Sequence, residues 1–537
     1  MKKYSKILMS LSFVGLLMSS CSMNVTPTNA EVYDPDESDM ITSFEKLQYH
    51  INGIYSAFRG TQYGAATMPM EFMCDGFNAA GGFGNNMGPI HRTDDTFRAS
   101  DYDSEYVWQV NYEAIKDYNV FLEALAKYEP EDEDAEWYAV CAEGEAKFFR
   151  AYAYMTLVRH FAKDYEPATA NKDLGVPVVL TYDQNAKPAR ATVKAVYDQI
   201  GKDLEDAKEL LEECYGGGGL AGYKWVSPDA VLALQARYYL DTHQYEDAMN
   251  NALELIISGN YELASDDETM LYEYLYDAGT EAIMQCPGSQ SENGSGTNTY
   301  YTRFSYMAAL KNAGYCSSGV YLNPYFIPSG KLVDLYEGSD LRWVHWFWNG
   351  TKSDDDFYGP RCDSRYAARL AGFGWAPYYY ARYFPLFTKY IGNPSLQTSS
   401  TTPNARQLVK PLLIGEQFLI LAEAAHEYGD DALALEALQM LQEYRGATAD
   451  TEFSEESLQN EWFKETVGEG LRMSCLKRWH AGFNGRYGQS MHAYYGTIAS
   501  GPDYERKVML PTDRAWQWPI PSWECRTNEN MEQNPGY

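Results

Sequence analysis

Aromatic residues beside polar side chains are the most distinctive chemical feature of this sequence. The stretch "TYYTRFSYM" places Tyr300, Tyr301 and Tyr306 beside Arg303. Tyr and Trp rings offer flat apolar faces that suit the C–H faces of sugars, while nearby polar groups hydrogen-bond to hydroxyls. Exposed rings are costly for solubility unless a ligand uses them. The pattern predicts a surface that binds uncharged sugars.

Three further stretches carry the same combination of rings and polar groups. They are "WVHWFWNG", "GWAPYYY" and the glycine-rich "CDGFNAAGGFGNN", and their candidate ligand contacts are Trp346, Trp348, Trp375, Tyr378, Asp75 and Asn78. Residues 300–390 hold 25 aromatic residues, together with many Gly, Pro and Asn. We expect a loop-rich layer over residues 290–390. Alternating side chains over residues 343–348 also fit a strand with one buried face, in which case those rings are core.

Catalytic motifs are missing from the sequence. It contains no H-E-x-x-H pair, no G-x-S-x-G elbow and no complete phosphate-binding loop. Two carboxylates suffice for glycoside hydrolysis, but among 75 acidic residues their presence carries little information. We predict no catalytic residues, no cofactor and no enzyme activity.

Cysteine spacing and net charge exclude other classes of protein. Eight cysteines follow Cys21 and none belongs to a CxxC pair, which argues against a structural zinc site. They are either disulfides, whose pairing the sequence leaves open, or isolated buried thiols. The formal net charge of −32 repels phosphate backbones and argues against a nucleic-acid partner.

The start of the chain reads as an export signal. Lys2, Lys3 and Lys6 precede an apolar stretch over residues 7–18, which is shorter than the roughly 20 residues that span a membrane. The following "SSC" resembles the lipobox of bacterial lipoproteins, in which cleavage precedes the cysteine and lipid joins its thiol. This predicts a signal peptide over residues 1–20, lipidation at Cys21 and a flexible tether over residues 21–40. The alternative is an ordinary signal peptide with an incidental cysteine.

Helical periodicity dominates the chain after the tether. Small and apolar residues recur every three or four positions in "EGEAKFFRAYAYMTLVRHF" and again from Val193 to Leu211, where the glycines from Gly216 end the helix. Ser227 is a candidate N-cap and Pro228 a candidate first helical residue.

Two pairs of helices have the character of tetratricopeptide repeats. The segment "SPDAVLALQARYYLDTHQYEDAMNNALELI" pairs two helices across small residues, and "EQFLILAEAAHEYGDDALALEALQML" repeats the theme. Any antiparallel helical hairpin gives a similar pattern. The fold class predicted is mainly α, with tetratricopeptide-like repeats and a loop-rich, partly β region.

The C-terminal end carries the clearest resemblance to a known family. The ending "WPIPSWECRTNENMEQNPGY" resembles the signature of SusD/RagB proteins, with Trp518, Pro519, Gln533, Asn534 and Tyr537 among the matching residues. The segments "YVWQVNYEAIKDYNVFLEAL", "GSDLRW", "FLILAEAAHEYG" and "GEGLRMSCLKRW" are similar to other elements of that family. The resemblance extends over almost the whole chain.

This resemblance implies a lipid-anchored protein of the bacterial outer membrane that faces outward. Such proteins cap a SusC-like TonB-dependent transporter and capture glycans, or in some cases peptides. It also implies an N-terminal helical part over residues 41–265 and a C-terminal part over residues 266–537. The competing hypotheses are peptide capture, a protein-interaction module whose aromatic residues are core, and an enzyme.

Overall fold

Helices form most of the architecture, as predicted. The computed structural model describes residues 41–79, 85–216, 219, 224–288, 314–316, 319–322, 326–348, 375–377, 386–390, 393–396, 407–486 and 508–537. Among the described residues, no helix combines the length and the apolar character that a membrane crossing needs.

The first helices start at polar caps. Ser43, Asp101, Asp132 and Thr192 each accept a hydrogen bond from a backbone N–H in the first turn of the helix that follows. The helices of this part are α2 (Phe44–Ala57), the π-helical η1 (Phe58–Gln62), α3 (Tyr63–Met73), α4 (Gly88–Arg92), α5 (Tyr102–Leu125), α6 (Glu133–Phe161) and α7 (Val193–Tyr215). Gly216, with φ of 71°, ends α7 as expected.

Both predicted helical hairpins are present. Helix α8 (Pro228–Asp241) begins at the Ser227 cap with Pro228 in its first turn, and it packs on α9 (Tyr245–Ile257). Helices α14 (Ile414–Tyr428) and α15 (Asp431–Tyr444) form the second hairpin. Ala233 and Ala236 on α8, and Ala248 and Ala252 on α9, are fully buried. Small side chains therefore line these helices where they are buried.

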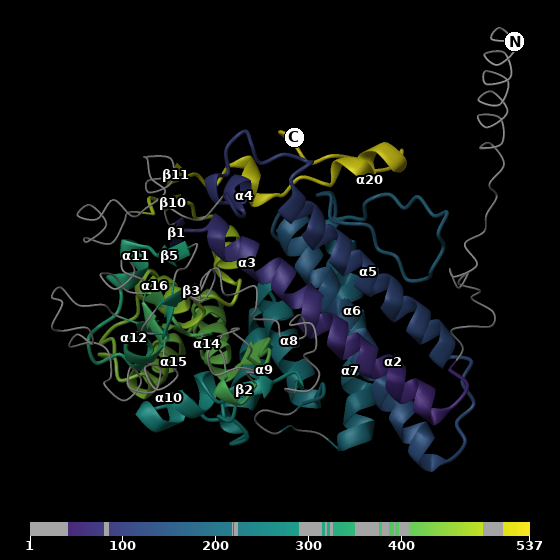
Figure 1. Ribbon diagram of the computed structural model, residues 1–537, viewed down its shortest axis with the longest axis horizontal. Helices are drawn as coiled ribbons and strands as arrows, with labels where there is room; N and C mark the ends of the chain where they lie inside the picture. Colours follow the sequence, from purple (N-terminus) through teal and green to yellow (C-terminus); the bar gives the residue numbers. More distant parts are fainter. Residues whose placement is uncertain are drawn as a thin grey trace, which may run out of the picture.

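The helices stack in one continuous series. Helix α6 packs on α5 and α7, α7 on α8, α8 on α9, α9 on α14, and α14 on α15. In Figure 1 this series runs from α5 and α7 on one side to α14 and α15 on the other, with α8 and α9 between them. The two hairpins thus join the N-terminal and C-terminal parts into one scaffold.

Short elements complete the C-terminal part. The helices are α10 (Asp267–Tyr274), α11 (Gly330–Val333), α12 (Leu341–Trp346), α16 (Glu455–Glu465), α17 (Arg472–Arg478) and α20 (Ser522–Thr527), with 3-10 turns η5 (Pro394–Leu396) and η6 (Arg514–Trp516). Strand β1 (Phe77–Ala79) pairs with β5 (Phe326–Pro328), β2 (Ala282–Met284) with β9 (Leu412–Leu413), β6 (Phe347–Trp348) with β8 (Leu386–Phe387), and β10 (Phe483–Asn484) with β11 (Val508–Met509), all antiparallel. Strand β4 (Gly319–Leu322) pairs antiparallel with β3 (Gly314–Cys316) and parallel with β7 (Trp375–Pro377).

The predicted strand over residues 343–348 is wrong for most of its length. Helix α12 occupies Leu341–Trp346, and only Phe347 and Trp348 are in a strand. Asp340 caps this helix by accepting a hydrogen bond from the backbone N–H of Arg342. The rings of Trp343 and Phe347 stack with centroids 5.3 Å apart. The Asp340 cap therefore favours a helix in a stretch whose aromatic residues suggested alternation.

The C-terminal signature locks the end of the chain onto α6. Trp518 is fully buried, and its backbone N–H donates to the carbonyl of His160. The Asn534 amide donates to the carbonyl of Phe161 at 2.8 Å and accepts from Arg190 at 2.7 Å. Figure 1 shows this segment, in yellow, running beside α5. These signature residues are structural.

Both alternatives for the cysteines occur. Cys141 in α6 and Cys214 in α7 form a disulfide that ties two neighbouring helices together. Cys74, Cys286 and Cys475 are buried free thiols.

Candidate functional site

Asp75 lies beneath the β1–β5 pair and faces the interior. Its carboxylate is fully buried and accepts hydrogen bonds from Arg472 at 3.0 and 3.1 Å and from Lys331 at 2.6 Å. Burial raises the pKa of Asp75, but the charges of Arg472 and Lys331 outweigh it and hold the pKa well below its usual range. This differs from the predicted ligand contact, because both carboxylate oxygens already have cationic partners. Asp75 instead fastens α17 to the loop after α3.

Asn78 is likewise enclosed. It stands in the middle of β1 opposite Ile327 of β5, with no exposed surface. The strand pair joins a segment near residue 78 to one near residue 327, so two chain segments from regions with predicted ligand contacts lie side by side. The two chain segments meet, while the Asn78 side chain itself points away from solvent.

Trp346 is a core residue in this structure. It ends α12, is fully buried, and packs edge-on against Tyr274 with ring centroids 5.0 Å apart. The Lys389 ammonium lies 3.8 Å from its ring centroid, a cation–π contact. The same ammonium donates to Glu469 at 2.6 Å. The ring therefore completes a buried charge cluster and presents no face to a ligand.

The other predicted contacts are placed in part or lie outside the described residues. Trp348 is in β6 and Trp375 is the first residue of β7, which runs parallel to β4. Tyr300, Tyr301, Arg303, Tyr306, Tyr378 and Cys21 lie outside the described residues. Contact of these eight with ligand or lipid stays a prediction.

A group of buried ion pairs lies beneath β6 and α12. Arg445 is fully buried and pairs with Glu281 and with Glu465. Arg342 is also fully buried and pairs with Asp340 and with Glu465. Burial raises the pKa of Glu465, but Arg445 and Arg342 more than offset this and lower it. Helix α12, which runs directly into the strand with Trp348, is thus held by buried ion pairs.

A hollow that the sequence analysis missed lies beside α5. We call it the α5 groove, and it has a volume of about 660 Å³. Its lining includes Tyr112, Tyr182 and Trp523, with Gln109, Glu113 and Gln184 among the polar side chains. Tyr182 and Trp523 remain 37% and 36% exposed, so their rings are accessible. A second hollow of about 550 Å³ between α2 and α5 shares Lys116 and Tyr182 with it.

The α5 groove has the composition of a sugar site on a small scale, with rings for stacking and amides for hydroxyls. Its residues come from α5, from the loop before α7 and from α20. They are separated in sequence, so no local cluster marks them. Trp523 lies in the C-terminal signature segment, but the sequence alone does not distinguish its partly exposed ring from the fully buried ring of Trp518.

Burial raises the pKa of Glu524, which lines the α5 groove, and also that of two enclosed carboxylates, Glu145 and Glu71, which line neither hollow. Burial raises the pKa of Glu145 to about 8 and that of Glu71 to about 7. Glu71 accepts a hydrogen bond from the backbone N–H of Gly470 at 2.8 Å. Both are under 6% exposed. Such shifts mark catalytic acids only where substrate can reach them.

Two family models match most of the chain. Residues 28–240 match a model described as "Starch-binding associating with outer membrane", and residues 280–537 match the SusD family. No curated protein matches the chain.

Solved structures of similar fold come from Bacteroides species. A SusD superfamily protein of Bacteroides thetaiotaomicron is 21% identical, with a TM-score of 0.71 over 92% of this chain and 100% of its own. A putative sugar-binding protein of Bacteroides vulgatus gives 21% and 0.70 over 93% and 100%. Surface glycan-binding protein A of Bacteroides fluxus gives 19% and 0.66 over 92% and 100%. At these identities the likeness shows the fold.

Proposed function

Because the chain belongs to the SusD family, we propose that it captures oligosaccharides at the cell surface without cleaving them. The observation that carries this proposal is the match of residues 28–240 to a model described as starch-binding and associated with the outer membrane. Two of the proteins with the same fold are named for binding sugar or glycan. The ring-rich composition of residues 300–390 agrees with such a ligand.

We further propose that lipid at Cys21 anchors the protein to the outer membrane, facing outward, and that it delivers its cargo to a SusC-like TonB-dependent transporter. Delivery requires release, which favours contacts spread over a shallow surface and a modest affinity. The family resemblance supports this arrangement, and the basic leader before "SSC" supports the lipid anchor.

Two surfaces are candidates for the cargo. The first is the ring-rich region with Trp348 and Trp375, which lie in strands β6 and β7. The second is the α5 groove with Tyr182 and Trp523. We favour the first, because it holds far more aromatic residues.

Single ring deletions distinguish the two surfaces. Using the tightest-binding oligosaccharide from a glycan panel, we expect Trp348→Ala or Trp375→Ala to weaken binding about fivefold or more by isothermal titration, since a ring contact contributes about 1 kcal/mol. Tyr428→Ala removes a 57% exposed ring at the end of α14 and is the matched control. Loss with Trp523→Ala or Tyr182→Ala alone would move the site to the α5 groove.

Two other outcomes would replace the proposal. Unchanged glycan retention in all four ring variants would favour a protein-interaction module whose aromatic residues serve as core. Tight binding of peptides with no binding of any oligosaccharide would favour peptide capture.

A further inference from the structure

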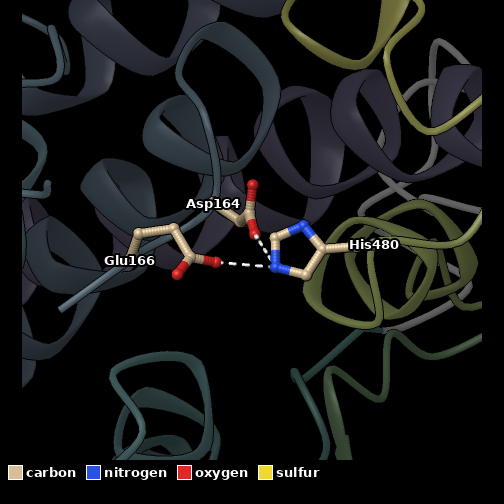
Figure 2. A group of neighbouring side chains, drawn as sticks. All are labelled: Asp164, Glu166 and His480. Atoms are coloured by element: carbon tan, nitrogen blue, oxygen red, sulfur yellow. Dashed lines mark ion pairs between the residues drawn. The ribbon is translucent and has the colours of Figure 1, made fainter. Parts of the chain in front are cut away.

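His480 meets two carboxylates outside the surfaces described so far. Figure 2 shows Asp164 and Glu166 converging on its ring. The Nε2 atom of His480 lies 2.7 Å from Oε1 of Glu166 and 3.8 Å from Oδ2 of Asp164. Asp164 and Glu166 follow the end of α6 at Phe161, and His480 follows the end of α17 at Arg478. The three groups thus come from opposite halves of the sequence.

The two carboxylate oxygens that face the ring lack ordinary partners. Oδ2 of Asp164 and Oε1 of Glu166 are shielded from solvent, and neither accepts a hydrogen bond within the described part of the chain. The short contact with His480 therefore lacks hydrogen-bond geometry. A shielded carboxylate oxygen without a donor is unfavourable. A cation between the three atoms would supply the missing partner to both.

The spacing suits a small divalent ion. A metal bound at about 2.0–2.2 Å from each ligand needs ligand atoms roughly 3.0–3.5 Å apart. The observed separations from Nε2, 2.7 and 3.8 Å, lie on either side of that range, and all three ligand atoms lie within 4.8 Å of one another. The His480 side chain is 63% exposed, which leaves room for water to complete the coordination.

We propose that Asp164, Glu166 and His480 form a site for a divalent transition metal, with Zn²⁺ the best match. One imidazole nitrogen with two carboxylate oxygens is a ligand set that zinc accepts, whereas Ca²⁺ and Mg²⁺ favour oxygen alone. This proposal departs from the sequence analysis, which used the cysteine spacing to argue against a structural zinc site, because the ligands here are a histidine and two carboxylates. Because the ligands come from both halves, a bound ion would fasten the loop after α6 to the segment after α17.

His426 provides an internal contrast. It also contacts two carboxylates, with Nδ1 lying 2.7 Å from Asp431 and Nε2 lying 3.8 Å from Glu455. There the two acids face opposite nitrogens of the ring, so no single ion can touch all three groups. At His480 both acids face one nitrogen. The same residue types thus predict a metal site in one place and an ordinary ion pair in the other.

Zinc titration of untagged protein, after dialysis against a chelator, tests this proposal. We expect isothermal titration to find one site per chain in the wild type, at least tenfold weaker in His480→Asn and unchanged in His426→Asn. Asparagine is the chosen replacement because His480 has a φ of 47°, a left-handed conformation that Asn tolerates.

The melting temperature gives a second readout. Zinc should raise it in the wild type and in His426→Asn but not in His480→Asn, because an ion that binds only the folded chain stabilises it. Asp164→Asn with Glu166→Gln keeps the shape of both side chains and should abolish the zinc response as well. The proposal fails if the wild type binds no zinc. It also fails if the His480 variant and the carboxylate variant bind zinc as tightly as the wild type, and the cluster is then an ordinary ion pair.

Discussion

The helical N-terminal part and the C-terminal part of this molecule are held together by different interactions. Between α6 and α7 apolar residues surround one buried ion pair, Arg150 with Asp203: Leu204, Ala207 and Leu211 are fully buried, and Gly144 lets Leu211 approach the α6 backbone closely. Between α10, α12, α15 and α16 the interior holds paired charges instead, centred on Arg342 and Arg445. The α6–α7 contact combines periodic apolar packing with a single buried ion pair, whereas the C-terminal part relies on a network in which Glu465 pairs with both arginines.

The two kinds of interior predict different losses of stability on substitution. An apolar helix interface loses contacts gradually as side chains are trimmed. A buried ion cluster fails abruptly, because removing one cation leaves its partners charged and without water. The region that carries Trp348 rests on the second kind of interior, so its shape depends on charges that remain paired.

Arg445→Met should give the largest loss of stability. The Arg445 guanidinium donates to Glu281 at 3.0 Å, to Glu465 at 3.1 Å and to the carbonyl of Ala264 at 3.0 Å. Its removal leaves two buried carboxylates without their main partner and should cost about 3–5 kcal/mol in the free energy of unfolding. Urea denaturation measures this.

Lys194→Met is the matched control for Arg445. Lys194 makes an exposed pair with Asp198 one helical turn away, and its loss should cost no more than about 0.5 kcal/mol. Similar losses in the two variants would mean that the C-terminal charges contribute no more than surface pairs, and the contrast between the parts would disappear.

Removal of the disulfide should come second, and it probes the helical part. The double change Cys141→Ser and Cys214→Ser opens a link across 73 residues between α6 and α7, which should cost about 2–4 kcal/mol. Thermal unfolding under oxidising conditions measures the change. Cys525→Ser, at a half-buried free thiol, is the control. If both variants melt together with the wild type, the disulfide adds no stability beyond the apolar packing and the Arg150–Asp203 pair that already join α6 to α7.

Glu145→Gln should have the smallest effect and the opposite sign. Glu145 is a buried acid on α6, and burial raises its pKa to about 8, opposed only by a hydrogen bond from Tyr55. A raised pKa means that the folded state binds more protons than the unfolded state between about pH 4.5 and 8. The wild type therefore loses stability as the pH rises through that window.

The glutamine variant avoids that loss because it stays neutral. We expect its free energy of unfolding to exceed that of the wild type by at least about 1 kcal/mol at pH 8 and to equal it near pH 4. Urea denaturation at several pH values checks this slope. A constant difference at all pH values would show that the pKa of Glu145 is the same in the folded and unfolded states and would contradict this prediction.

The same difference explains how far the sequence could be read. The helices from Val193 and from Pro228 were predictable, because their apolar residues recur at helical spacing and Ser227 and Gly216 mark ends. The charge cluster was not, since nothing local connects Arg445 to Glu281. In the sequence, the acidic residues that become buried cannot be told from the many that stay exposed to solvent.

The candidate site shows the same limit. The pairing of β1 with β5 joins the segment after Asp75 to a strand within residues 290–390, and both regions contain predicted ligand contacts. The sequence did not predict which side chains face solvent. Asp75 and Trp346 have suitable chemistry for a ligand, yet both are buried, where they contact Arg472 and Lys389. The α5 groove was not predicted because Tyr182 and Trp523, which line it together, are far apart in the sequence.

The most direct test of the proposed function is calorimetric titration of the mature, lipid-free protein with a panel of host and plant oligosaccharides, followed by chromatography of the same mixtures. We predict saturable binding of modest affinity to at least one oligosaccharide class, recovered uncleaved. Absence of binding across the panel, or release of shorter sugars without any added hydrolase, would contradict capture without catalysis.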